Sequence, residues 1–257
     1  MTDRTSDIPR ALAQPGFMNS PDARSLRILA EYLEPLFRFE KHSIEDTIVF
    51  FGSSRIPPRD EAEAGKPAAE LAAYYEAARE LATRLTRWSK ELTGGGRRFV
   101  VCSGGGPGIM EAANRGASEA KGINVGLNIS LPHEQHENPF ITRDLAFQFH
   151  YFFMRKFWFT YLAKAVVVFP GGFGTLDELF EALTLVQTGK IRKKMPIVIF
   201  GNAYWSQVIN WDALQRHGTI DAADLDLLFR TDSVDEAFDF ITEQLSVYGM
   251  ESPGPTL

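Results

Sequence analysis

The sequence of 257 residues contains a single cysteine, Cys102, which excludes an intramolecular disulfide and any metal site built from several thiolates. It also lacks an apolar stretch of 18 residues, about the shortest length that spans a membrane as a helix. The most aromatic segment, residues 151–169, is interrupted by Arg155, Lys156 and Lys164. The first ten residues, MTDRTSDIPR, have no apolar core of the kind that secretory signals carry. These absences predict a cytoplasmic protein that does not enter the membrane.

The sequence also has fewer basic than acidic residues. The chain has 27 Lys and Arg against 33 Asp and Glu, for a formal net charge of −6 and a pI near 5.5. A nucleic-acid binder needs a broad positive field, so this balance argues against nucleic acid as a partner. Hydrophobic residues make up 44% of the chain. That content is too high for intrinsic disorder and predicts a folded domain with a substantial core.

Short apolar runs alternate with helical patterns along the chain. A parallel sheet covered by helices on both faces produces this alternation, so we expect one doubly wound α/β domain. Residues 25–41 predict an additional N-terminal helix that Pro35 kinks or divides. We expect residues 1–22 to form a flexible leader, 23–250 the single domain and 251–257 a flexible tail. The apolar runs are residues 47–51, 98–102, 124–131, 145–149, 165–169 and 196–200.

Three of the predicted strands end in loops of small residues, at 52–54, 103–108 and 170–175. Glycine allows a close backbone approach, and the helix that follows offers unpaired N–H groups and a positive dipole end. One such loop is readily explained as a tight turn, whereas two facing one crevice favour an anion site. The run G-G-G-P-G at 104–108 does not fit G-x-G-x-x-G, and no P-loop motif occurs. A single phosphate therefore fits these loops better than a dinucleotide.

Two charged side chains near the third loop are the candidate catalytic groups. Glu178 lies three residues after Thr175, a spacing that on its own favours a capping box with Thr175 as the N-cap. Turned toward the crevice, its carboxylate could instead stabilise positive charge at an anomeric carbon or activate water. Arg155 lies in an apolar helical segment, where it is either a structural or snorkelling residue or a fork for a phosphate or carboxylate.

Other polar residues carry weaker signals. Glu111 follows the second small-residue loop and is either a dipole-compensating carboxylate or a ribose contact; we favour the latter. His133 and His136 have the spacing of metal ligands, but no further ligand stands at a fixed distance, so we expect a solvated loop and no metal. We expect His150 to be a core histidine at a strand end and Cys102 to be a buried, small apolar residue.

The string P-G-G-F-G-T-L-D-E at 170–178 resembles the P-G-G-x-G-T-x-x-E signature of the LOG ("lonely guy") phosphoribohydrolases, long labelled "possible lysine decarboxylase". The Arg155-Lys156 pair and the 104–108 loop leading into Met110 and Glu111 also match, and the likeness extends from about residue 47 to 200. The length and the aromatic run before Arg155 are closer to the bacterial long forms than to the plant proteins. The resemblance implies a Rossmann-like fold and assembly into dimers or larger homo-oligomers.

The resemblance further implies hydrolysis of a purine nucleoside 5′-monophosphate to free base and ribose 5-phosphate, without a cofactor. AMP and N6-substituted cytokinin ribotides are the candidate substrates, and the sequence leaves the preferred base open. Arg155 and Glu178 would be the catalytic pair. The alternative is a non-catalytic carrier of a phosphate-bearing nucleotide or cofactor, similar to the molybdenum cofactor carriers. The residues expected to contact the substrate are Gly52, Ser53, Gly105, Gly106, Gly108, Met110, Glu111, Lys156, Gly171, Gly172, Gly174 and Thr175.

Overall fold

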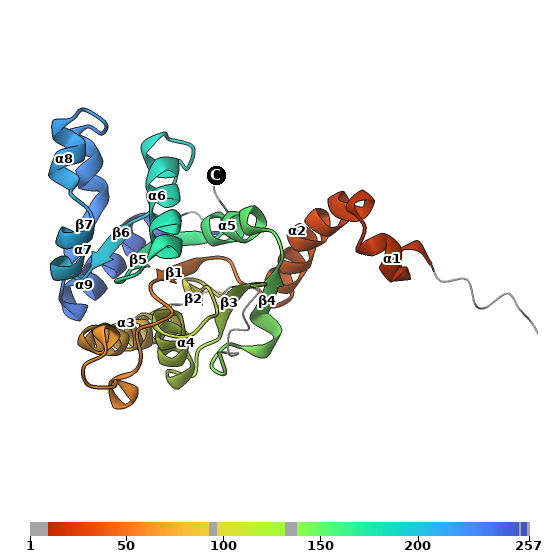
Figure 1. Ribbon diagram of the computed structural model, residues 1–257, viewed down its shortest axis with the longest axis horizontal. Helices are drawn as coiled ribbons and strands as arrows, with labels where there is room; N and C mark the ends of the chain where they lie inside the picture. The colour runs from red at the N-terminus through yellow and green to blue at the C-terminus, as the bar shows by residue number, and fades with distance from the viewer. Residues whose placement is uncertain (1–9, 93–96, 132–137, 252, 256–257) are drawn as a thin grey trace, which may run out of the picture.

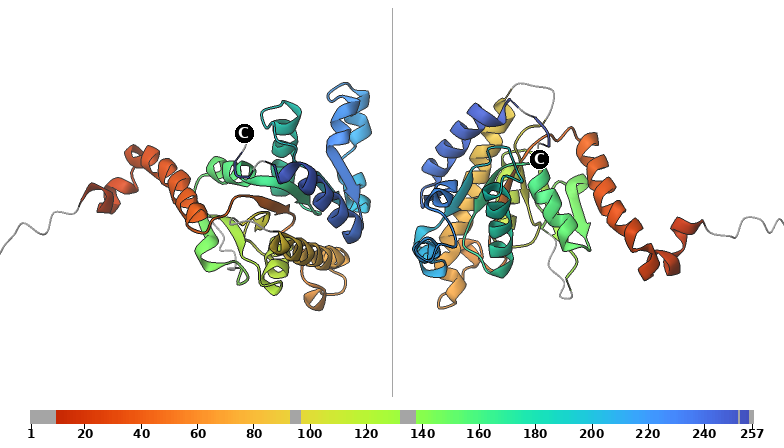
Figure 2. Two further views of the ribbon diagram at one scale, coloured as in Figure 1. Left: turned by 180° about the vertical axis from the view of Figure 1, so that it is seen from behind. Right: turned by 90° about the horizontal axis from the view of Figure 1, so that it is seen from above.

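A computed structural model describes residues 10–92, 97–131, 138–251 and 253–255. In this part of the chain seven strands form one parallel sheet in the order β4-β3-β2-β1-β5-β6-β7. Helices cover both faces of the sheet, as Figures 1 and 2 show. The α/β doubly wound architecture predicted from the sequence is confirmed. The strands are β1 (Thr47–Phe51), β2 (Val100–Ser103), β3 (Asn124–Ile129), β4 (Ala146–Phe149), β5 (Ala163–Val168), β6 (Ile197–Phe200) and β7 (Leu228–Thr231).

The helices divide between the two faces. Side chains from α3, α4 and α9 pack in the hydrophobic cluster on one face, whereas α2, α5, α6, α7 and α8 contribute to the cluster on the other. The helices are α1 (Pro15–Met18), α2 (Arg24–Lys41), α3 (Ala72–Glu91), α4 (Ile109–Glu119), α5 (Phe152–Tyr161), α6 (Phe173–Gln187), α7 (Asn202–Val208), α8 (Trp211–Arg216) and α9 (Val234–Gln244).

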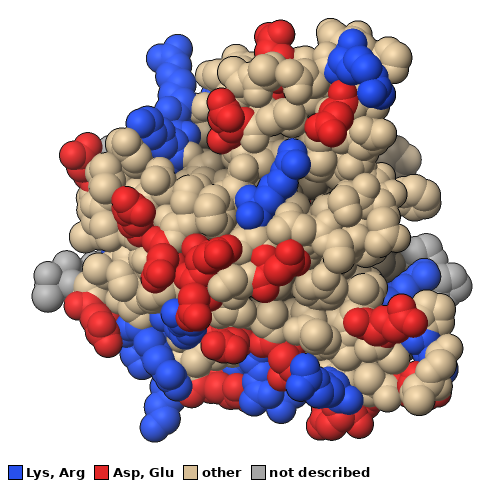
Figure 3. Space-filling view, turned by 90° about the vertical axis from the view of Figure 1, so that its left-hand side faces the viewer, with Lys and Arg blue, Asp and Glu red and all other residues tan. Residues whose placement is uncertain are grey.

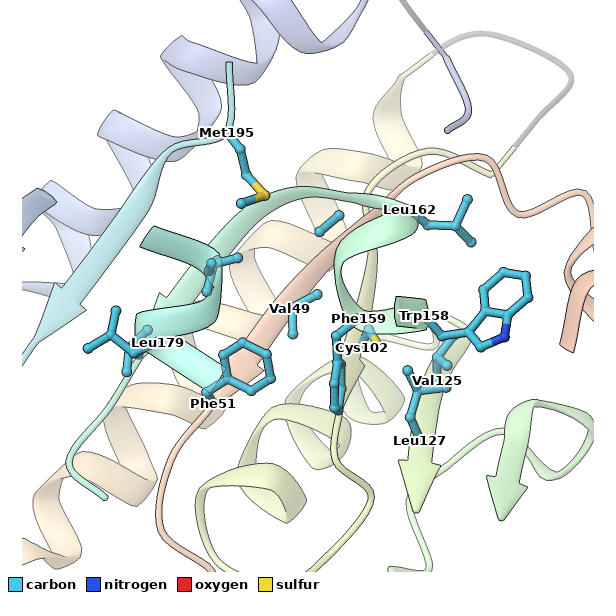
Figure 4. Packing of buried hydrophobic residues seen from close by; sticks show 14 of the residues in the cluster. Val49, Phe51, Cys102, Val125, Leu127, Trp158, Phe159, Leu162, Leu179 and Met195 are labelled. Carbon is cyan, nitrogen blue, oxygen red and sulfur yellow. The ribbon is translucent and has the colours of Figure 1, made fainter. Parts of the chain in front are cut away.

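Strand β1 shows how the sequence builds both cores. All five of its residues are buried, and successive side chains point to opposite faces. Val49 and Phe51 belong to the cluster under α5 and α6, whereas Ile48 and Phe50 belong to the cluster over α3 and α4. Figure 4 shows Phe51 beside Phe159 of α5, and the two rings meet edge to face at 5.0 Å. This two-sided burial explains why the strands appear in the sequence as continuous apolar runs.

The strand order reverses direction at β1. Its neighbours are β2 on one side and β5 on the other, and both pair with it in parallel register. The chain therefore moves outward through β2, β3 and β4, and then returns through α5 to β5 on the other side of β1. Ligands in open parallel sheets bind beyond the carboxyl ends of the strands at such a switch point. The three small-residue loops follow β1, β2 and β5.

Helix α2 is one continuous element. Of the two outcomes predicted at Pro35, a kink or a division, the division was therefore wrong. Proline cannot donate to the carbonyl four residues earlier, which leaves the carbonyl of Glu31 without its helical partner. The indole Nε1 of Trp158 on α5 donates to that carbonyl at 3.0 Å. A tertiary hydrogen bond thus takes over from the missing helical one. Beyond this contact α2 and α1 project from the body of the molecule (Figure 1).

The structure adds detail to the N-terminal segment and differs from the prediction for one histidine. Short helical turns occupy 11–13, 15–18 and 21–23. His150 is exposed rather than part of the core. Its backbone N–H donates to the carboxylate of Glu31 at 2.7 Å, which places the residue at the surface beside α2. His133 and His136 lie outside the described residues.

Two surface observations bear on partners. No helix in the described ranges is long and apolar enough to cross a membrane. The face in Figure 3 carries basic and acidic side chains next to one another, without a broad field of one sign. That mixture matches the small negative net charge of the sequence.

Candidate active site

Hydrogen bonds from one residue hold the three small-residue loops together. The backbone N–H of Ser53, after β1, donates to the carbonyl of Pro170, after β5, at 2.9 Å. The carbonyl of Ser53 in turn accepts from the N–H of Ile109, the first residue of α4, at 3.0 Å. The loops after β1, β2 and β5 therefore meet at the switch point of the sheet. Gly52 packs against the same region, because a Cβ placed on it would lie 2.5 Å from Cγ2 of Ile109.

Arg155, in the first turn of α5, lies beneath these loops. Only 8% of the residue is exposed. Its Nε donates to the carbonyl of Leu127 on β3 at 2.7 Å, and its guanidinium lies over the ring of Phe159 at 4.8 Å. A Cβ placed on Gly104 would come within 2.5 Å of Nη2, so the loop after β2 lies directly against the guanidinium. The cation is thus fixed in place by contacts from a strand, a helix and a loop.

Glu178 is the partner of this buried cation. Arg155 Nη1 donates to Glu178 Oε1 at 3.2 Å, and the side chains are 9% and 13% exposed respectively. The capping-box alternative is wrong, because α6 begins at Phe173 with Gly172 as its N-cap. Thr175 lies inside the helix and is buried, and Glu178 reaches across to α5 rather than back to its own backbone. The convergence expected of the two charged candidates is therefore present.

The environment of Glu178 shifts its protonation equilibrium. Burial raises the pKa of Glu178 from the ordinary value to about 7, although the charge of Arg155 acts in the opposite direction. Burial likewise lowers the pKa of Arg155, but an arginine remains protonated at neutral pH. A carboxyl whose pKa lies near 7 can exchange a proton at physiological pH, which is the property that general acid–base catalysis requires.

Two helix N-termini open at the same place. Within the described residues, neither α4 nor α6 has a side chain that caps its first turn. The first N–H groups of a helix need partners, and a phosphate supplies them well. Gly172 and Gly174 are exposed, and a Cβ placed on either would meet no atom within 4 Å. Glycine at these two positions therefore leaves open space over the N-terminus of α6.

Other glycines in the loops are required by the fold itself. Gly108 has φ of +70°, and a Cβ there would lie 2.3 Å from the carbonyl oxygen of Ser53. A Cβ on Gly105 or Gly171 would collide with the side chain of Asn128 or Thr175. These residues shape the loops, whereas Gly172 and Gly174 leave room for a ligand. Gly106, which lies between Gly105 and Gly108 in the second loop, is also buried.

The remaining predicted contacts lie around this centre. The ammonium of Lys156 bridges the carboxylates of Asp177 and Glu181 at 3.0 and 3.2 Å, which clamps α5 against α6. Met110 lies beside the loop after β2, because a Cβ on Gly104 would be 2.6 Å from its sulfur. Glu111 accepts a hydrogen bond from the hydroxyl of Tyr75 at 2.7 Å, an interaction that neither sequence interpretation anticipated.

Sequence reasoning missed a buried polar network under the second loop. Ser103 Oγ donates to the side-chain oxygen of Asn114 at 2.6 Å and accepts from the N–H of Gly105 at 3.0 Å. Asn114 also accepts from Asn138 and donates to Asn124. An asparagine within an otherwise apolar helical face is the signal that could have indicated it. Tyr204, whose hydroxyl donates to the carbonyl of Gly171 at 2.8 Å, carried no such signal.

Comparison with known proteins places the chain in a family. The family model described as "Possible lysine decarboxylase" matches residues 110–241, just over half of the sequence. The chain belongs to the possible lysine decarboxylase family. The matched region contains the Arg155-Glu178 pair and the whole 170–178 signature, so the family expected from the signature is confirmed. No curated protein sequence matches the chain.

Three solved structures are similar to the chain, and the first of them, with a TM-score of 0.50, supports the fold. TM1055, a Northeast Structural Genomics Consortium target, is 22% identical with a TM-score of 0.50, covering 77% of this chain and 99% of that one. The molybdenum cofactor binding protein of the phototrophic bacterium Rippkaea orientalis is 17% identical, with a TM-score of 0.48 and coverages of 77% and 96%. The Moco carrier protein of Chlamydomonas reinhardtii is 18% identical, with a TM-score of 0.45 and coverages of 79% and 99%.

The two classes of glycine give a prediction. Gly174→Ala adds a methyl group to open space within a helix, so we expect the unfolding midpoint to be unchanged or slightly higher, while affinity for AMP falls by about tenfold or more. Gly108→Ala, which meets the Ser53 carbonyl at a positive φ, should lower the midpoint. Thermal unfolding and calorimetric titration of both variants measure these effects. Full AMP affinity in a stable Gly174→Ala protein would contradict the ligand space over α6.

Proposed function

We propose that this protein hydrolyses the N-glycosidic bond of a purine nucleoside 5′-monophosphate, with AMP or an N6-substituted AMP as substrate. The observation that carries the proposal is the buried pair of Arg155 and Glu178 beside two helix N-termini that no side chain caps in the described residues. The helix N-termini suit a phosphate, and the carboxylate suits the anomeric carbon of the attached sugar. This combination matches the chemistry expected of a phosphoribohydrolase.

In the proposed reaction the substrate phosphate binds over the first turn of α6, in the space left by Gly172 and Gly174. This anchoring restricts the ribose and contributes remote binding energy to the reacting centre. The bond between C1′ and the base nitrogen breaks, and the electron pair leaves with the base. Glu178, as the carboxylate, stabilises the positive charge at C1′ and takes a proton from the attacking water. The water oxygen becomes the C1′ hydroxyl of ribose 5-phosphate. The proton that Glu178 took from the water is passed on to the base nitrogen, which regenerates the carboxylate.

Arg155 has two roles in this scheme. Its Nη1 fixes one oxygen of Glu178, so that the carboxylate keeps a single orientation. Its Nη2 lies against Gly104 in the loop after β2, where a planar, permanent cation is suited to hold a ribose hydroxyl or phosphate oxygen. The Nε bond to Leu127 keeps the guanidinium from following the ligand. Lysine could not make these three contacts at once.

The lysine decarboxylation in the family description does not fit the residues around the loops. That chemistry relies on pyridoxal phosphate bound to a lysine as a Schiff base. Lys156, the lysine next to Arg155, bonds two carboxylates. Burial lowers the pKa of Lys193 to about 7. However, the ammonium of Lys193 donates to the carbonyls of Thr160 and Tyr161, which lie at the amino end of β5, away from the loops. We therefore derive no step through that cofactor.

We also propose that the enzyme acts in the cytoplasm as a homodimer or larger homo-oligomer. Large aromatic side chains are exposed near the site: Phe152 and Phe153 are 53% and 52% exposed at the start of α5, and Phe173 is 93% exposed at the start of α6. Helix α2 adds Leu29, at 49%, and Phe37, at 66%. Apolar surface of this kind favours contact with a second copy.

The catalytic role of Glu178 is tested by a matched pair of substitutions. Glu178→Gln keeps an acceptor for Arg155 but removes the negative charge, so we expect adenine release from AMP to fall about 10²-fold or more. Asp177→Asn removes the same charge one residue away, from an exposed side chain bonded to Lys156, and should retain activity within about threefold. Chromatography of free base and ribose 5-phosphate measures both.

The same assay decides between hydrolysis and the carrier alternative. A panel of AMP, GMP, IMP, CMP and UMP, with one N6-substituted AMP, identifies the base that is released fastest. Tight retention of intact nucleotide without any release would favour the carrier. Equal loss of activity in Glu178→Gln and Asp177→Asn would remove Glu178 from the mechanism.

The raised pKa of Glu178 predicts the pH profile. The carboxylate is the active form in the proposed mechanism, and its folded pKa of about 7 lies above the ordinary value. Activity should therefore fall as the pH drops through 7, rather than near the ordinary glutamate value of about 4.3, and level off above it. The negative charge of Asp177 contributes to this rise, so Asp177→Asn should move the inflection of kcat/KM to lower pH. A rate that increases as the pH falls below 7 would instead assign Glu178 the role of an acid.

The assembly state has its own test. Light scattering should give a mass of at least twice 28.8 kDa for the wild-type protein. Phe152→Ser should lower that mass, because the change removes an aromatic ring that is 53% exposed. A monomeric wild-type protein at about 100 μM, well above the Kd of ordinary stable interfaces, would contradict this proposal.

A further inference from the structure

A cavity lies at the amino ends of β2 and β3, at the opposite end of these strands from the small-residue loops. It has a volume of about 400 Å³ and is formed where α3 ends, β2 begins and the turn from α4 enters β3. This volume lies within the range of ordinary small-molecule sites. Its apolar wall comes from Leu92, Phe99 and Ile123, and its polar wall from Thr86, Ser89, Lys90, Arg97, Arg98 and Lys121.

The charge of this cavity is entirely of one sign. Among the described residues that line the cavity, four are cationic and none is Asp or Glu. Arg98 is already engaged, because it pairs with the buried carboxylate of Asp46. Lys90 donates to the carbonyls of Ala120 and Lys121 at 3.0 and 3.3 Å, which anchors its ammonium at the rim with a donor still available. In a protein with a net charge of −6, this is a local concentration of positive charge.

Two residues of the wall have a backbone conformation that side chains rarely adopt. Phe99 and Lys121 have φ of +54° and +55°. Lys121 follows the end of α4, where its N–H bonds the carbonyl of Ser118, and this is a position at which helices usually place glycine. Strained non-glycine residues persist mainly where a side chain is needed for function. Here the cation of Lys121 lines the cavity, whereas the ring of Phe99 is buried in the core behind the cavity wall.

We propose that this cavity is a second ligand site, which binds a small phosphorylated molecule separately from the candidate active site. Lys90, Arg97 and Lys121 hold the phosphate, and Leu92 and Ile123 contact the less polar part of the ligand. The site lies at the amino ends of β2 and β3, whereas the proposed substrate lies beyond the carboxyl ends. Strand β2 and helix α4 both run from the cavity to the loop at 103–108, so they connect the two sites.

The experiment uses Trp88, whose ring stacks on Phe99 at 5.3 Å, as a local reporter. Pyrophosphate is titrated into the wild-type chain at about 0.15 M ionic strength, where distant surface charges are largely screened. We expect saturable quenching that disappears in Trp88→Phe while calorimetry still detects binding. Lys121→Gly should weaken this binding about tenfold or more and yet raise the unfolding midpoint of the free protein, because glycine relieves the positive φ.

Matched variants keep the result interpretable. Lys90→Met removes a second cation of the cavity and should weaken binding to a similar extent. Arg216→Ala removes the same charge from an exposed position on α8 and should leave the titration unchanged. Base release from AMP without added pyrophosphate should stay within about twofold in Lys121→Gly, which separates this site from the active site. The proposal is overturned if the wild-type chain shows no Trp88 response up to about 10 mM pyrophosphate, or if Arg216→Ala weakens binding as much as Lys121→Gly.

Discussion

A buried ion pair between two helices is the interaction on which the functional account depends. Arg155 and Glu178 are both nearly inaccessible, and removing two charges from water costs several kcal/mol for each ion in a typical protein interior. The fold offsets this cost with the carbonyl of Leu127, the ring of Phe159 and the charge attraction of the pair itself. The offset is incomplete for Glu178, whose pKa is raised to about 7. A carboxyl held at this balance is costly for stability and useful for proton transfer.

The sheet topology brings this pair to the ligand space. Because β5 returns beside β1, the loops after β1, β2 and β5 meet, and the backbone of Ser53 links the other two. The ligand space itself is left by small residues rather than built by large ones. Gly108 is required by its own backbone conformation, whereas Gly174 is free of internal constraint. A glycine without a structural reason, at the open N-terminus of a helix, supports the proposed position of the phosphate.

Much of this arrangement was predictable from the sequence because it depends on local patterns. Two-sided burial makes parallel strands continuous apolar runs, and strand-to-helix loops carry glycines that are visible in one dimension. The interactions that could not be predicted are contacts between distant segments. Trp158 replaces the hydrogen bond that Pro35 cannot make, so a residue that normally interrupts a helix is accommodated. Thr175 and Glu178 have capping-box spacing, but α6 begins three residues earlier than that spacing predicts, which frees the carboxylate for Arg155.

The same limit applies to the polar residues that lie beneath the 103–108 loop. The network around Asn114 connects the 103–108 loop to Asn124 and Asn138, yet each of these residues alone is an ordinary polar residue in the sequence. The exposure of His150 likewise depends on where α2 packs, which its neighbours in sequence do not determine. The Asn114 network and the exposure of His150 both depend on contacts between residues that are far apart in the sequence, and these contacts are known only from the folded structure.

A crystal structure of the Glu178→Gln protein with AMP is the most direct measurement of the central claim. The account predicts the phosphate over the first turn of α6, between Gly172 and Gly174, and the C1′ atom facing the side chain at position 178, with Arg155 in contact with the sugar or the phosphate. A nucleotide bound away from these loops, or a side chain at position 178 turned from the ribose while Arg155 touches no part of the ligand, would contradict it.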